Sequence, residues 1–191
     1  TINDDITVTC AVQPIFAPVD TVTLNWRTAY NAVQQTPMLD DGTNGDATAA
    51  DGIYTAVIPK TATGYTAGAM VRWYMTATDT SANSSRWPLY TSGESTREYF
   101  GTMLEDPGFT TTLPVWHWFA QNTAAAATRT GTRGSVFFNG KLYDMVAHLV
   151  HKDREGRLAV VALLMIKGAG NPNVQAVWNH LPLERNVEYP A

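Results

Sequence analysis

The sequence holds a single cysteine, Cys10, among its 191 residues. An internal disulfide needs two cysteines, and a zinc site built on cysteine needs at least as many, so both are excluded. No apolar run approaches the roughly 20 residues with which a helix spans a bilayer. We therefore expect no membrane span, and any bound metal must use histidine, aspartate or glutamate ligands.

Charged residues are also scarce, at 16% of the chain, and the net charge is −4. Residues 1–100 carry ten acids against five bases, and residues 101–191 carry eight bases against seven acids. Neither half offers the dense basic surface that binds a phosphate backbone, so we expect no nucleic-acid partner. The hydrophobic content of 45% is that of a folded protein with a buried core.

The first hundred residues alternate between polar and apolar positions. Five runs are rich in Val, Ile, Thr, Tyr and Trp, and clusters of Pro, Gly, Asn or Asp separate them. These runs are "ITVTCAV", "VTLNWRTA", "IYTAVIP", "AMVRWYMTATD" and "REYFGTM". Short strands with turn signals and no helix between them are typical of a sandwich. We predict a mainly β fold, with an immunoglobulin- or fibronectin-like β-sandwich over residues 1–103 followed by a small β-β-α segment.

The loop "LDDGTNGDATAADGIY" gathers acidic residues among glycines. Its acids are Asp40, Asp41, Asp46 and Asp51. Calcium takes several carboxylate and carbonyl oxygens from a tightly turning backbone, so these four residues form a candidate calcium site. In the alternative interpretation, which we favour, Asp and Gly serve the turns of a polar hairpin loop and its side-chain-to-backbone hydrogen bonds.

The segment from "MLDDGTNGD" to "MTATDTSAN" resembles the sandwich module that precedes a CotH-type kinase-like domain in secreted bacterial proteins. The resemblance continues from "EYFGTMLEDPGF" to "NGKLYD", which is similar to the start of that kinase-like domain. Such modules are accessory and position a neighbouring domain. The resemblance, together with abundant Thr and Ala and little Lys, implies an extracellular or periplasmic protein.

Residues 104–138 form the expected linker and the start of the CotH-like segment. "LEDPGF" and "TTTLP" are turn-rich, "PVWHWFA" indicates a buried strand, and "QNTAAAATRTGTRG" indicates a loop or a short helix. His117 stands between two tryptophans, and we interpret it as a packed imidazole rather than a metal ligand.

The run "AHLVHKD" carries two histidines within a strand-like stretch. It belongs to "NGKLYDMVAHLVHKDREGRLAVVALLMIKGAGNPNVQAVWNHLP", residues 139–182, which resembles the middle of a bacterial α-class carbonic anhydrase. The resemblance implies two strands, a turn and a helix that begins at "NPN". In that family the first histidine of "HLVH" is a zinc ligand, and here that position is His148. His151 would point to the opposite face of the strand, because side chains alternate along it.

The resemblance covers only part of a zinc site. A zinc hydrase needs three neutral imidazoles and an open fourth position, and the family draws two of its ligands from an upstream "HxH" strand. This sequence contains no "HxH", and Val146 stands where the family has a carboxylate that orients the ligand. We therefore expect residues 139–191 to be a carbonic-anhydrase-like fragment without a complete active site.

Three functions remain open. We favour a secreted accessory or adhesive β-sandwich module with no active site of its own. The alternatives are a degenerate or incomplete carbonic-anhydrase-related zinc protein, which as an enzyme would be a carbonate dehydratase-type lyase, and a truncated CotH-type kinase-like protein. "NGKLYD" fits both resemblances, which favours a chimeric or truncated chain. The apolar strand "LAVVALLMI" would leave an exposed edge, where we expect a second copy or another protein to pair.

Overall fold

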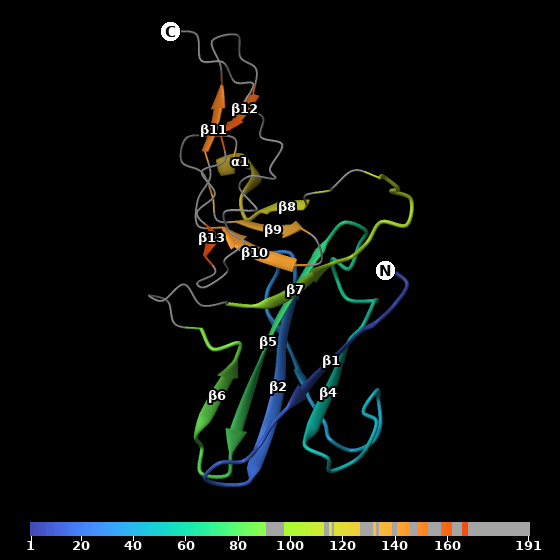
Figure 1. Cartoon of the computed structure of the whole chain (residues 1–191), viewed down its shortest axis with the longest axis vertical. Coiled ribbons are helices and arrows are strands. Elements are labelled where there is room, and N and C mark those ends of the chain that lie inside the picture. The colour runs from blue at the N-terminus through green and yellow to red at the C-terminus, as the bar shows by residue number, and fades with distance from the viewer. Residues whose placement is uncertain are drawn as a thin grey trace.

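The computed structural model describes residues 1–90, 98–112, 115, 117–126, 132, 134–138, 141–145, 149–152, 158–161 and 166–167. Within these ranges the chain is mainly β, as the sequence predicts, and every sheet is antiparallel (Figure 1). From residue 138 onward only the backbone is described. In the described ranges no helix has the length and hydrophobicity of a membrane span.

Two sheets face each other in the first hundred residues. The smaller sheet pairs β1 (Ile6–Ala11) with β4 (Ile53–Ile58). The larger sheet runs, in spatial order, β3 (Gln34–Pro37), β2 (Val19–Thr28), β5 (Met70–Asp79) and β6 (Ser84–Trp87). β7 (Phe100–Met103) pairs with the first half of β5, whereas β6 pairs with its second half. Both short strands therefore lie along the same side of β5, opposite β2.

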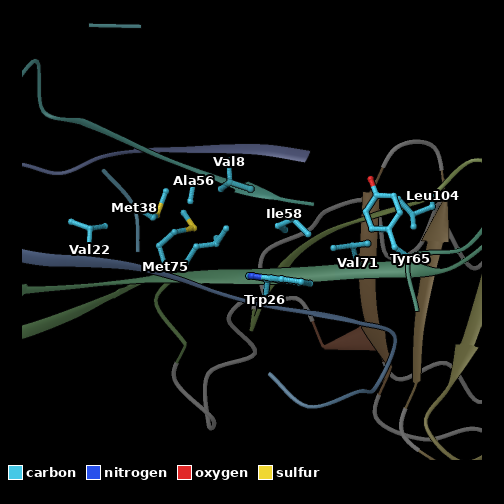
Figure 2. Close-up of a cluster of buried hydrophobic side chains, with 11 residues drawn as sticks. Val8, Val22, Trp26, Met38, Ala56, Ile58, Tyr65, Val71, Met75 and Leu104 are labelled. Carbon is cyan, nitrogen blue, oxygen red and sulfur yellow. The ribbon is translucent and has the colours of Figure 1, made fainter. Parts of the chain in front are cut away.

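The two sheets bury one hydrophobic core between them. Figure 2 shows Val8 and Ile58 of the smaller sheet above Val71 and Met75 of the larger one. Ile58 has no exposed surface, and neither does Leu24 in the middle of β2. Complete burial of such a side chain is worth about 1.5–3 kcal/mol. The alternation visible in the sequence is thus the separation of core from solvent.

All five strands expected from alternation are present, as β1, β2, β4, β5 and β7. The sequence pattern did not predict β3 and β6, whose sequences are "QQTP" and "SSRW". Both are short and largely exposed, and each pairs with one long neighbour. A strand that buries no face needs no apolar alternation, so the pattern could not reveal these two.

The remaining strands form two further sheets. A four-stranded sheet, the second sheet, has the order β13 (Ile166–Lys167), β10 (Lys141–Met145), β9 (Gly134–Phe138) and β8 (His117–Ala120). The short α1 (Thr123–Ala126) lies between β8 and β9 in the chain, and β11 (Leu149–Lys152) pairs with β12 (Leu158–Val161). The run "LAVVALLMIKG", expected as one strand, is divided between β12 and β13 in different sheets, because β12 pairs with β11 and β13 with β10. The helix expected over 171–182 lies outside the described residues.

Candidate functional site

The loop between β3 and β4 brings three of the four predicted calcium ligands together. Asp40, Asp46 and Asp51 each offer a carboxylate oxygen, and these oxygens lie within 4.8 Å of one another. Asp46 is 8% exposed, whereas Asp51 is on the surface. Asp41 does not join the group, because its Oδ1 accepts hydrogen bonds from the amide and hydroxyl of Thr43 at 2.9 and 2.8 Å.

Backbone amides also donate hydrogen bonds to all three carboxylates, and the donor to Asp51 is the amide of Ile53 at 2.9 Å. Asp40 accepts from the amides of Asp51 and Gly52 at 3.1 and 2.9 Å, and Asp46 accepts from the amide of Gly42 at 2.6 Å. Gly42 has a φ of +71°, which places it in the left-handed region that favours glycine. The turn geometry expected of this loop is therefore present. The hydrogen bonds from these amides leave acceptor sites on the carboxylates free, since each carboxylate carries about four lone-pair sites.

The cluster of Asp40, Asp46 and Asp51 has no cationic neighbour among the described residues. Among the described residues, the ion pair that is found joins the terminal amine of Thr1 to Asp4 at 3.2 Å, away from this cluster. Three like charges at this separation repel one another, and partial burial strengthens the repulsion. A divalent cation that prefers oxygen ligands would relieve it, with further ligands from carbonyl groups or water.

His117 is the only histidine whose side chain the structure describes. It is half-buried in β8, opposite Phe137 of β9, and the two rings lie 6.4 Å apart. Burial lowers the pKa of the imidazole, which favours its neutral form at neutral pH. The group of three metal-ligating side chains found in the described region does not include it.

The predicted zinc ligand His148 lies outside the described residues, as do Val146 and His180. Of His151 the backbone is described, in β11 opposite Ala159. The assignment of His148 to zinc therefore stays a prediction.

A contact that the sequence did not predict joins the sandwich to the second sheet. The hydroxyl of Tyr30 donates a hydrogen bond to the carbonyl of Phe119 at 2.9 Å, and it lies 3.4 Å from the hydroxyl of Ser135. Ser135 has no exposed surface. The Arg72 guanidinium lies 4.6 Å from the centre of the Tyr30 ring, and the Arg27 guanidinium lies 6.0 Å from it. Cation–π contacts of this kind hold the ring in place.

The sequence contains one signal for this contact. Arg27 lies near the end of one expected strand and Arg72 near the start of another, and the register of β2 and β5 sets them directly opposite each other. The pairing of these strands was not predictable from either run alone, so the arginine pair became visible only in the structure.

Comparison with known proteins finds similarity over a short part of the chain. A carbonic anhydrase of Nostoc sp. is 42% identical over 50 residues, which are 26% of this chain and 19% of that protein. Carbonic anhydrases of Klebsiella pneumoniae and Pectobacterium carotovorum are 43% and 36% identical over 44 residues, each 23% of this chain and 18% of the relative. The chain thus spans about a fifth of the length of the curated relatives it matches.

No family model matches the chain, and no solved structure matches it. The short matches support a carbonic-anhydrase-like segment, as the sequence predicts. The resemblance to CotH-type proteins gains no support from these comparisons and stays a prediction.

Proposed function

We propose that residues 1–103 are a non-catalytic accessory module of an extracellular or periplasmic protein, and that the module supports the sheet that follows it. The observation that carries this proposal is the contact of Tyr30 with β8 and β9. The two sheets of the sandwich bury their own core between them, and Tyr30 extends from the end of β2 to the backbone of a separate sheet. Such a contact orients a neighbour.

The backbone beside Tyr30 is held firmly, so its hydroxyl has a defined position. The amide of Ala29 donates to the carbonyl of Met70, and the carbonyl of Ala29 accepts from the Arg72 guanidinium at 3.1 Å. On the other side of the tyrosine, Asn31 donates to the hydroxyl of Thr28 at 2.9 Å. A preorganised donor loses little conformational entropy when it binds a carbonyl group, which favours a lasting contact.

The variant Tyr30→Phe tests this support role. It removes the hydrogen bonds of the hydroxyl with Phe119 and Ser135, each worth about 0.5–1.5 kcal/mol, so we expect amide exchange in β8 and β9 to accelerate at least roughly threefold. Exchange in β2 and β5 should stay as it is. The matched control is Tyr54→Phe, because no hydroxyl bond of Tyr54 is found among the described residues. Equal exchange rates in Tyr30→Phe and the unaltered protein would contradict the support role.

The module also binds calcium in this proposal, through Asp40, Asp46 and Asp51. Two features support it: the three carboxylates converge, and no described base neutralises them. The ion would tie the loop before β4 to the start of that strand. Its effect is therefore on the stability of the module rather than on a reaction.

A second candidate is a carbonic-anhydrase-related zinc protein, which the similarity to carbonic anhydrases favours. His148 would be one zinc ligand, and two more imidazoles would come from His117, His180 or a second copy. Bound zinc supplies a water whose pKa is near 7. Of these histidines, the structure describes the side chain of His117.

Elemental analysis of the purified chain separates the two candidates. In the zinc candidate the protein holds zinc and hydrates carbon dioxide, and His148→Ala loses both properties while His151→Ala keeps them. In the accessory candidate zinc is absent, and neither variant changes metal content. Zinc that stays bound in His148→Ala would remove the assignment of that residue.

A further inference from the structure

A groove of about 750 Å³ opens along one side of the sandwich. Residues 7–13, which include most of β1, line one wall, and the facing wall comes mainly from β5, β6 and β7. Apolar side chains dominate the lining, among them Val8, Trp73, Met75 and Phe100. The groove exists because the described part of the smaller sheet has two strands, and it covers less width than the larger sheet beneath it.

The edge of β1 that borders the groove presents backbone groups that pair with no other described strand. The amide of Val12 donates to the carbonyl of Gly52 at 2.9 Å. In an antiparallel pair every second residue bonds to the partner strand, so Val12 and every second residue before it direct their backbone groups toward β4. The residues that alternate with Val12, namely Thr7, Thr9 and Ala11, direct their amides and carbonyls away from β4. No described strand pairs with them, and among the described residues the carbonyl of Ala11 accepts a hydrogen bond only from the Cys10 thiol, at 3.8 Å.

We propose that this groove binds an extended peptide segment, which adds to β1 as a third strand of the smaller sheet and places alternate apolar side chains over β5 and β6. A row of outward amides and carbonyls at strand spacing matches another extended backbone. From Ile6 to Gln13 the edge holds neither a charged residue nor a proline, the usual devices that block strand addition. The inference goes beyond the accessory role, because it names what the module binds.

The same geometry disfavours a second folded copy as the occupant. If β1 of another copy paired with this edge, its inward side chains Ile6 and Val8 would stay packed in their own core. That arrangement would pair the backbone groups of the β1 edge but leave the groove unfilled. An extended segment that belongs to no sheet can pair with the edge and also place its side chains in the groove. It would also cover Trp87, which is 57% exposed at the rim and lies 6.2 Å from the Phe100 ring.

Cys10 provides a specific reporter, because it lines the groove and is the only cysteine of the chain. The probe is a synthetic peptide of alternating threonine and valine, with lysine at both ends for solubility. We expect the alkylation rate of Cys10 by iodoacetamide in the full chain to fall as the peptide is added, about tenfold when nine grooves in ten are filled. A peptide of the same composition, with its threonines and valines in two blocks, should give no protection.

Two substitutions at exposed Thr9 test the backbone pairing. Thr9→Val keeps the outward amide, so protection by the alternating peptide should be retained. Thr9→Pro removes that amide at a position where β4 does not use it, so protection should be lost. The proposal is overturned if the alternating peptide protects neither the unaltered chain nor Thr9→Val, if the block peptide protects equally, or if protection persists in folded Thr9→Pro. It is also overturned if Cys10 becomes protected without peptide as the protein concentration rises and the mass doubles, which would identify a second copy.

Discussion

In the sandwich, the pairs that build the two core-forming sheets join distant parts of the chain, and only the short β3 and β6 pair with the strand just before them, whereas in the second sheet most neighbours are consecutive. β1 pairs with β4 and β2 with β5, across long intervening segments. β8 pairs with β9 and β9 with β10, each with the next strand along the chain, and β13 pairs with β10. A sheet of consecutive strands depends on its turns, but the sandwich depends on a core that only distant residues complete. Damage to that core should therefore spread through the whole sandwich.

The largest expected effect follows from Leu24→Ala, at the centre of that core. Leu24 has no exposed surface, so its truncation should lower the free energy of unfolding by about 2–5 kcal/mol. Urea unfolding followed by tryptophan fluorescence measures the loss. The control Ile15→Ala, at a side chain that is 83% exposed, should stay within about 0.5 kcal/mol.

The same Leu24→Ala variant sharpens the comparison between the two regions. If the second sheet is held by its own turns, amide exchange in β9 and β10 should change much less than in β2 and β5. Equal acceleration in all four strands would show that the regions unfold as one unit.

Calcium should act on the sandwich alone. At a concentration about 100-fold above its dissociation constant, the ion should stabilise the sandwich by about 2.7 kcal/mol. Asp46→Asn should remove the shift, because it takes a carboxylate from the cluster. Asp20→Asn makes the same charge change at an exposed position outside the cluster and should keep the shift. A melting temperature that is identical in calcium and in chelator contradicts the site.

Two glycines of the sandwich form a matched pair for the next effect. Gly64 and Gly68 have φ values of +80° and +76°, so alanine is strained at both. At Gly64 a Cβ would also meet the Thr28 hydroxyl at 2.7 Å, whereas nothing lies within 4 Å at Gly68. We expect Gly64→Ala to lose about 1–3 kcal/mol more than Gly68→Ala. Equal losses in thermal unfolding would show that the end of β2 yields to the added methyl group.

The smallest expected effect is acid sensitivity at the turn between β5 and β6. The Asn83 side chain and the amides of Ser81 and Asn83 donate to Asp79 and lower the pKa of its carboxyl. Because the folded-state pKa is depressed, this stabilisation is complete above the unfolded value of about 4 and is lost as the pH falls through the folded-state value. Asp79→Asn should therefore flatten the pH dependence of the melting temperature in this acidic range. An unchanged slope would refute it.

Much of the sandwich was predictable because its long strands bury one face. Alternation in "ITVTCAV" and "VTLNWRTA" indicates β1 and β2 directly, and the polar edge strands β3 and β6 carry no such signal. The acids of the loop were predictable as a group, but the exclusion of Asp41 was not. Its carboxylate bonds to the nearby Thr43, and neighbours in sequence do not reveal which oxygens converge.

The sequence by itself determined a mainly β chain, a free cysteine, an acidic glycine-containing loop and a carbonic-anhydrase-like segment. These features depend on residue types and on patterns between near neighbours. Only the tertiary structure decided that Asp40, Asp46 and Asp51 converge, that Tyr30 reaches β8, and that one edge of β1 borders an open groove. Each of these depends on which distant strands pair, and that choice is made by the burial of a shared core.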